Sequence, residues 1–215
     1  MSDTYNPQEI KYELTRGALK LISKYNYGVS IDTKSDLIIR DIDLLKEINK
    51  KNNVIIKFTI TTPRDEIAKI IEPHVCTSSK RLEAIKKLSE NGIFTGIMMN
   101  PTLPFITDSE EDIKRLVKFA HENGAKFIHT YMGMTLRENQ RDYYFKQLDK
   151  NFKGLKEKYI KYYGNKYNCA TPKCKELYKI FKEECDRYGI LYNMKDIIKA
   201  YKKEIPEDEQ MTLFI

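Results

Sequence analysis

The sequence contains no apolar run that approaches the roughly 18 residues needed to cross a membrane as a helix. It also lacks the basic stretch followed by an apolar stretch that is typical of a signal peptide, because it begins with the polar residues MSDTYNPQEI. Its 215 residues, 41% hydrophobic and 32% charged, are enough for one well-buried core. We therefore expect a globular, cytoplasmic protein with no membrane partner.

The sequence has few cysteines, and none of them form a CxxC pair. The four are Cys76, Cys169, Cys174 and Cys185. Disulfides are not expected without a secretory signal, and the spacing of the last three matches no known zinc pattern. Free structural thiols are the favoured interpretation, and a metal clip in the C-terminal part is the alternative. We predict no metal ligands in this chain.

The net charge of +7 is unevenly distributed along the chain. Residues 146–203 contain 16 Lys or Arg against 7 Asp or Glu, which leaves 22 against 24 in the rest. A basic, tyrosine-rich segment would suit an anionic partner such as nucleic acid. A lysine-rich solvated surface is the alternative that we favour.

Short apolar runs alternate with helical patterns through the first two thirds of the chain. The runs predict strands near residues 28–32, 54–60, 93–99 and 126–131, and each follows a typical helix stop such as Gly92 or Gly124. Alternating strands and helices predict a parallel sheet, either a barrel or a doubly wound layer. Beyond about residue 136 the pattern is helical and aromatic. We therefore predict an α/β fold with C-terminal helices.

Polar residues follow each predicted strand, where functional groups of parallel α/β folds gather. In chain order they are Thr33, Lys34, Ser35, Thr59, Thr61, Thr62, Asn100, Thr102, His129, Thr130 and Tyr131. Lys34 is a compact cation placed to meet a carboxylate or a phosphate. The sequence does not decide between functional and ordinary strand-end roles for His129 and Tyr131.

The chain begins with a helix rather than with a strand. Asn6 and Pro7 predict a helix start, and the helix to about residue 25 is expected to bury Ile10, Leu14, Ala18, Leu21 and Ile22. A strand should precede it in a strand–helix series, and four strands cannot close a barrel that ordinarily takes eight or, in open versions, about six. We therefore expect a partial barrel truncated at its N-terminus.

Several segments resemble radical S-adenosylmethionine proteins related to spore photoproduct lyase, the DNA repair photolyase-like family. They are SDTYNPQE, TKSDLIIRDIDLL, FTITT, EPHVCTSSKRLEAIKKLSENGI and NPTLPFITD, followed by GMTLRENQRDYY, YNC and EQMTLF. The resemblance implies a partial barrel (a partial TIM barrel) over residues 1–135 and a helical extension packed on it over residues 136–215.

The resemblance also implies two cofactors, S-adenosylmethionine and a four-iron four-sulfur cluster. Family members hold the cluster with three thiolates of a CxxxCxxC loop, which this sequence lacks. By resemblance, Lys34 would meet the methionine carboxylate of S-adenosylmethionine, Thr59 would offer a hydroxyl, and Glu72 and Arg81 would form an ion pair at the same rim. The full set of cofactor-binding residues that it implies is Ser2, Lys34, Ser35, Thr59, Thr61, Glu72 and Arg81.

Three functional hypotheses follow. The first is a radical S-adenosylmethionine enzyme that generates a 5′-deoxyadenosyl radical on an unknown substrate. The second is a non-catalytic remnant whose basic helices bind nucleic acid or another partner. The third is a half-enzyme that acts with a separately encoded N-terminal piece bearing the cluster. No catalytic residue is assigned by any of them.

Overall fold

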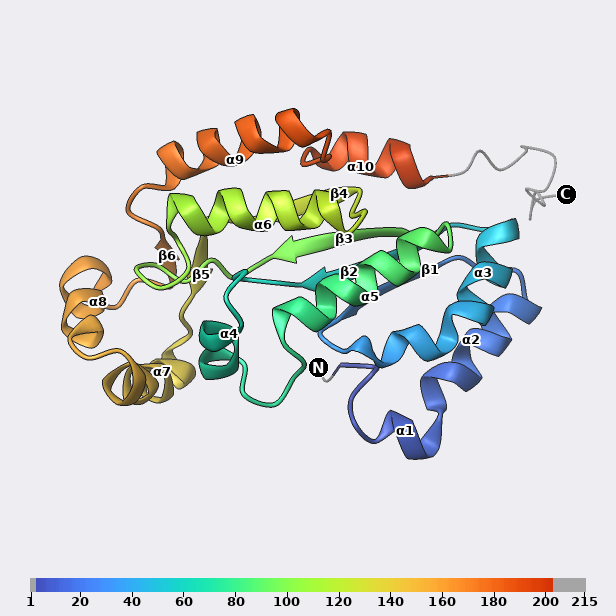
Figure 1. The fold of residues 1–215 in the computed structure, drawn as a ribbon. Coiled ribbons are helices and arrows are strands. Elements are labelled where there is room, and N and C mark those ends of the chain that lie inside the picture. Colours follow the sequence, from blue (N-terminus) through green and yellow to red (C-terminus); the bar gives the residue numbers. More distant parts are fainter. Residues whose placement is uncertain (1–2, 203–215) are drawn as a thin grey trace, which may run out of the picture.

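The computed structural model describes residues 3–202 (Figure 1). Four strands form a parallel sheet in the order β1-β2-β3-β4, so that β1 and β4 are its edges. The strands are β1 Val29–Thr33, β2 Val54–Thr59, β3 Phe94–Met99 and β4 Phe127–Thr130. All four agree with the predicted strands to within one or two residues, and the predicted α/β class with a parallel sheet is confirmed.

Helices cover the sheet and extend beyond both of its ends (Figure 1). The first half of the chain holds α1 Glu9–Tyr12, α2 Leu14–Lys24, the 3-10 helix η1 Asp36–Asp41, α3 Ile42–Lys51, α4 Asp65–Ile71 and α5 Ser78–Glu90. The second half holds α6 Glu110–Glu122, α7 Glu138–Asn151, α8 Leu155–Tyr163, α9 Cys174–Tyr188 and α10 Met194–Tyr201. A short antiparallel pair, β5 Gly133–Thr135 with β6 Asn168–Ala170, was not predicted.

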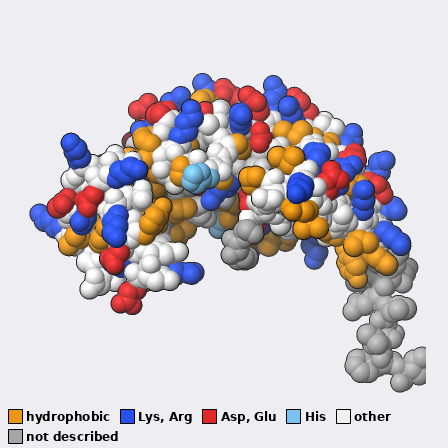
Figure 2. Space-filling view, turned by 90° about the horizontal axis from the view of Figure 1, so that it is seen from below, with side chains coloured by type: hydrophobic (Ala, Val, Ile, Leu, Met, Phe, Trp, Pro, Cys, Tyr) orange, Lys and Arg blue, Asp and Glu red, His pale blue; other side chains and the backbone are white. Residues whose placement is uncertain are grey.

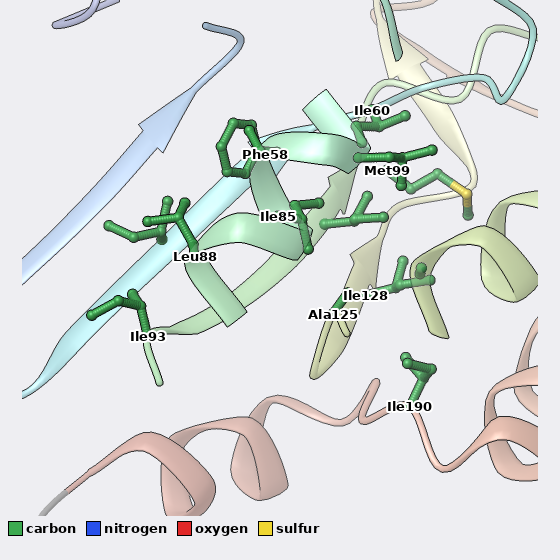
Figure 3. Packing of buried hydrophobic residues seen from close by; sticks show 14 of the residues in the cluster. Phe58, Ile60, Ile85, Leu88, Ile93, Met99, Ala125, Ile128 and Ile190 are labelled. Carbon is green, nitrogen blue, oxygen red and sulfur yellow. The ribbon is translucent and has the colours of Figure 1, made fainter. Parts of the chain in front are cut away.

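The main hydrophobic core lies on one face of the sheet, under α3, α5 and α6. The cluster includes Phe58 of β2, Ile128 of β4, and Ile85 and Leu88 of α5 (Figure 3). These strands alternate side chains between the two faces of the sheet, and the long apolar runs supply buried residues to both. The short β-branched runs fold as strands because a strand in this sheet can bury apolar side chains on both of its faces.

The second face of the sheet is covered only at its amino-terminal half. There Phe127 and Ile55 pack with Ile197 of α10, and Phe94 and Tyr201 lie against the same cluster. Towards the carboxyl ends of the strands this face is half-buried or exposed. We call this part the open face; its residues are Asp32, Lys57, Thr59, Met98 and His129.

Helices α7 and α8 form a separate hydrophobic cluster at one end of the molecule. Tyr159 is fully buried there, accepts a hydrogen bond from the Tyr144 hydroxyl and donates to the carbonyl of Pro104. In the space-filling view the molecule is arched, with a hollow between this end and the end that carries α2 (Figure 2).

The predicted first helix is wrong in two respects. It breaks at Glu13, whose φ of 47° is left-handed, and it leaves Ile10, Leu14 and Leu21 exposed while burying Leu19. The break is stabilised because the Glu9 carboxylate accepts hydrogen bonds from the backbone N–H groups of Thr15 and Arg16, at 3.0 and 3.2 Å. These are groups at the start of α2 that lack partners within the helix.

Two helices begin later than the polar residues before them indicate, since Thr62 before Pro63 and Thr107 three residues before Glu110 both fit the pattern of a helix start. Ser109, not Thr107, caps α6 by accepting from the N–H of Asp112 at 3.1 Å. The Thr107 hydroxyl instead accepts from the N–H of Leu103, at 2.8 Å. Helix α4 begins at Asp65 rather than directly after Thr62.

The four strands do not close into a barrel within the described residues, which is compatible with the predicted partial barrel. The division at residue 135 stays a prediction. The segment EQMTLF, one of those that carry the family resemblance, belongs to residues 203–215, which lie outside the described residues. Among the helices of residues 3–202, none has the length and apolarity required to traverse a bilayer.

Candidate functional site

The carboxyl end of β1 is organised by a carboxylate from the start of the chain. Asp3 accepts hydrogen bonds from the Thr33 hydroxyl at 2.9 Å and from the N–H of Lys34 at 2.7 Å. It also accepts from the N–H of Tyr5 at 2.9 Å. Thr33 in turn accepts from the N–H of Ser35 at 3.0 Å. This loop therefore holds the backbone of Lys34 in one conformation.

The Lys34 side chain extends from this loop towards a carboxylate that two cations share. Its Nζ lies 3.1 Å from Oε1 of Glu72, and Oε2 of Glu72 lies 2.7 Å from Nη1 of Arg81. Glu72 directly follows α4 and Arg81 belongs to α5, so three segments meet here. Two positive charges against one carboxylate leave these three side chains with a surplus of one positive charge.

Arg81 is the most buried charged group of the cluster, with 0% of its surface exposed. Its Nε donates to the carbonyl of Cys76 at 2.9 Å and its Nη1 donates to the carbonyl of Thr59 at 2.7 Å. Its Nη2 is buried and has no hydrogen-bond partner within residues 3–202. A guanidinium has five N–H donors, so Arg81 retains unused donor capacity beside Glu72.

Cys76 is hydrogen-bonded to two members of the same network, Lys34 and Arg81. Its Sγ donates a hydrogen bond to the carbonyl of Lys34 at 3.0 Å. Burial raises the pKa of this thiol above its usual range, and the carboxylate of Asp36 raises it further. A neutral thiol held in this way ties the α4–α5 connection to the end of β1, and a reactive thiolate is not favoured.

The structure brings together part of the predicted set of cofactor-binding residues. Lys34, Glu72 and Arg81 form one network, and Thr59 joins it through its carbonyl. Ser35 uses its hydroxyl to accept from the N–H of Leu37 at 3.3 Å, as the cap of η1. The binding role of all these residues stays a prediction.

Two further members of the predicted set stand apart from the network. The Thr61 hydroxyl is buried and has no hydrogen-bond partner among the described residues, a feature that points to a group outside the chain or to strain. Ser2 lies outside the described residues.

Sequence reasoning missed Asp3 and an ion pair on the open face. Lys57 of β2 and Asp32 of β1 are register partners, and Lys57 Nζ lies 2.9 Å from Asp32 Oδ2. A lysine in the middle of the apolar run NVIIKFTI was the available signal, because a strand buried on both faces would not place a cation there. No local pattern indicated Asp3, since its partners lie about 30 residues away.

These side chains fit one of the two expected cofactors and not the other. A ligand carboxylate would meet the ammonium group of Lys34, which has only a shared carboxylate as its partner, and hydrogen bonds between charged groups are the strong ones in such sites. The four-iron four-sulfur cluster does not fit, because among residues 3–202 no group of three His, Cys, Asp or Glu side chains is placed to hold a metal ion. Cys169 and Cys185 are buried in different hydrophobic clusters.

A parallel sheet with a network of charged side chains at the carboxyl ends of its strands defines an α/β protein. The model of the radical SAM superfamily matches residues 3–120, which is more than half of the chain. This chain belongs to the radical SAM superfamily.

The chain is also similar to proteins of archaea, bacteria and an archaeal virus. An uncharacterized protein of Methanocaldococcus jannaschii is 40% identical over 128 residues, 60% of this chain and 48% of that protein. An uncharacterized protein of Acidianus two-tailed virus is 32% identical over 122 residues, 55% of this chain and 40% of that protein. One of Mycobacterium tuberculosis is 26% identical over 162 residues, 75% of this chain and 47% of that protein. The chain thus spans about half the length of these relatives.

Solved structures of spore photoproduct lyase share the fold. A complex with dinucleoside spore photoproduct has a TM-score of 0.62 and 17% identity, and covers 85% of this chain and 55% of that one. A variant with bound AdoMet and dinucleoside spore photoproduct also scores 0.62 at 17% identity, over 87% of this chain and 57% of that one. Identity at this level shows the fold alone, and the predicted resemblance to the family of spore photoproduct lyase is confirmed at that level.

Proposed function

We propose that this chain is the S-adenosylmethionine-binding part of a radical S-adenosylmethionine enzyme of the spore photoproduct lyase-like kind, acting on an unidentified substrate. In this proposal Lys34 holds the methionine carboxylate, while Glu72 and Arg81 hold Lys34 in place. Thr59 and Thr61 line the adjoining strand end. The iron–sulfur cluster would be held by residues outside this sequence.

The observation that carries the proposal is the shared carboxylate of Glu72. It gives Lys34 a fixed position 3.1 Å away while being shared with a second cation, Arg81, at 2.7 Å. The superfamily to which the chain belongs supports S-adenosylmethionine as the ligand that supplies the matching carboxylate.

Titration calorimetry with S-adenosylmethionine tests the role of Lys34. We expect Lys34→Ala to weaken binding by about ten- to more than a hundredfold, because a hydrogen bond to a charged group contributes about 1.5 to 3 kcal/mol. Lys34→Arg should restore binding only in part, since a planar guanidinium does not occupy the space of a compact ammonium.

Lys24→Ala is the matched control, because Lys24 lies at the end of α2, away from the strand ends. It should leave the affinity unchanged. Equal affinity for the wild type and Lys34→Ala would contradict the assignment of Lys34.

A second hypothesis, binding of nucleic acid by the basic C-terminal helices, has one structural observation in its favour. Residues 137–167 carry nine Lys or Arg against four Asp or Glu, and exposed Tyr143, Tyr162 and Tyr167 lie among them. Basic side chains with interleaved aromatic rings suit single-stranded nucleic acid. Failure of the wild-type chain to bind S-adenosylmethionine would favour this hypothesis.

A further inference from the structure

A pocket of about 520 Å³ lies at the carboxyl end of β4. Its lining comes from His129 and Thr130 of β4, from α9, and from the residues that join α9 to α10. Strand β4 is the edge strand opposite to β1, so the pocket lies on the other side of the sheet from Lys34. Ligands of parallel α/β folds bind at the carboxyl ends of the strands, and this pocket has the size of a site for one small molecule.

The chain that follows α9 forms one border of the pocket. It returns alongside β4, where the N–H of Ile128 donates to the carbonyl of Leu191 at 2.9 Å and the N–H of Leu191 donates to the carbonyl of Lys126 at 3.0 Å. These bonds hold the next residue, Tyr192, at the end of β4. Because this border is fixed by backbone hydrogen bonds, a ligand has less chain to order when it binds.

Aromatic side chains form the apolar part of the lining. The ring of Phe181 is buried, and its centroid lies 5.9 Å from that of Tyr178 and 6.0 Å from that of Tyr192. Tyr178 and Met194 are 39% and 47% exposed, so their apolar surface is available to a ligand. Aromatic rings attract one another at centroid distances of about 4.5 to 7 Å, and a thioether adapts to the shape of a ring. The lining thus favours a ligand that contains an aromatic ring.

The charge of the pocket comes from Lys182 of α9. No acidic side chain is among the described residues that line the pocket, and Lys182 makes no ion pair within residues 3–202. Asp186, one turn further along α9, interacts with Tyr192 instead, since desolvation and a hydrogen bond with this carboxylate raise the pKa of the tyrosine hydroxyl. The ammonium group of Lys182, 5.7 Å from the ring of Tyr178, is therefore available to an anionic ligand.

Asn193 adds an uncharged donor to the lining. Its Oδ1 accepts from the N–H of Lys195 at 3.0 Å, as the cap of α10. Because this bond fixes the side-chain oxygen, the amide nitrogen offers its two N–H groups as donors. One ammonium group and one amide match the two oxygens of a carboxylate. Arginine, which is preferred for phosphate groups, is absent from the described residues of the lining, so the pocket favours a carboxylate.

We propose that this pocket binds an aromatic ring that carries a carboxylate. The ring packs on Tyr178 and Tyr192, and the carboxylate accepts hydrogen bonds from Lys182 and Asn193. At about 4.8 Å between neighbouring strands, β4 lies about 14 Å from β1, which leaves the network around Lys34 free for S-adenosylmethionine. The ring then belongs to the unidentified substrate, an assignment that rests on the proposed function, whereas the binding itself does not.

The probe is N-acetyl-tryptophan, whose indole fluorescence can be followed because the chain contains no tryptophan. Fluorescence anisotropy of this probe should show saturable one-to-one binding to the 215-residue chain. N-acetyl-tryptophanamide, which has the ring without the charge, should bind at least tenfold more weakly, since it loses a hydrogen bond between charged groups. N-acetyl-alanine, which has the carboxylate without the ring, should not displace the probe.

Two substitutions in α9 test the assigned contacts. Lys182→Gln should weaken binding of the probe at least tenfold, and Tyr178→Ala should weaken it about two- to tenfold through the loss of a ring contact. Lys179→Gln is the matched control, because Lys179 lies on the same helix, pairs with Glu183 and does not line the pocket. It should leave the affinity unchanged. Lys182 and Tyr178 are exposed, so circular dichroism of these variants should match that of the wild type.

Absence of saturable binding, or equal affinity for the wild type and Lys182→Gln, would overturn the proposal. Tighter binding of adenosine monophosphate than of N-acetyl-tryptophan would also overturn it, because the pocket would then be a nucleotide site. The probe and S-adenosylmethionine should bind together, and displacement of the probe by S-adenosylmethionine would overturn the assignment to the substrate. A chain that binds the probe but not S-adenosylmethionine would retain the pocket and contradict the proposed function.

Discussion

Arg81 combines a permanent charge with complete burial, a combination that is rare unless the charge is paired. Its partners are the Glu72 carboxylate and two backbone carbonyls, those of Thr59 and Cys76. The guanidinium therefore joins β2, the α4–α5 connection and α5. This contribution to the fold is separate from any role in binding.

Arg81→Met should lower the free energy of unfolding by about 3 to 5 kcal/mol, because removing one partner of a buried ion pair leaves the other uncompensated. Urea denaturation followed by circular dichroism measures the change. Lys179→Met is the control, since Lys179 pairs with Glu183 on the exposed side of α9 and surface pairs contribute little. A loss below about 1 kcal/mol for Arg81→Met would show that Lys34 alone compensates Glu72.

At the scale of elements, the strands were predictable and the ends of several helices were not. Apolar, β-branched runs such as NVIIKFTI have few alternatives to a buried strand, and the positions of all four were confirmed. The start of a helix depends on which of several polar side chains accepts hydrogen bonds from its first backbone N–H groups, which have no partners within the helix. Ser109 performs this role for α6 although Thr107 fitted the capping pattern equally well.

The candidate site was predictable only where its residues follow strands. Lys34 was found from its place after β1, and Glu72 with Arg81 came from family resemblance. Asp3 was missed because its hydrogen bonds to Thr33 and Lys34 depend on how the first residues return to the sheet. In α2, Leu14, Ala18 and Leu21 were predicted to be buried but are exposed, since a periodic pattern shows an apolar face but not what covers it.

Two glycines provide a test of how elements tolerate a side chain. Gly17 lies inside α2 with open space around it, so Gly17→Ala should raise the free energy of unfolding by about 0.5 to 1 kcal/mol. At Gly96 in β3 an added Cβ would overlap the ring of Phe127, so Gly96→Ala should lower it by about 1 to 3 kcal/mol. Thermal or urea denaturation of both variants measures whether each substitution raises or lowers the free energy of unfolding.

The opposite sign at either glycine would contradict the packing described for that element. Gly92 offers a further comparison, since its φ of 74° strains any L side chain although nothing lies near it. Gly92→Ala should therefore destabilise through the backbone alone.

At the scale of the whole molecule, the chain should not assemble a four-iron cluster by itself. Reconstitution of the 215-residue chain with iron and sulfide, followed by iron analysis, should give far fewer than four irons per chain. The reason is that the four described cysteines lie in different places. Cys76 is beside Lys34, Cys169 and Cys185 are in different hydrophobic clusters, and Cys174 is at the start of α9.

Cys169→Ser with Cys174→Ser is the informative variant for this prediction. Near four irons per wild-type chain, lost in this variant, would contradict the prediction and establish a cluster site in the C-terminal part.

Helix α10 joins the far end of the described chain to the amino-terminal half of the sheet. Its Ile197 and Tyr201 pack with Phe94 and Phe127, and the open face with Lys57 continues from this contact to the carboxyl ends of the strands. How much of this face is covered therefore depends on side chains about 160 residues away from Lys34 in sequence. Substitutions in α10 would change the exposed area of the sheet without touching Lys34, Glu72 or Arg81.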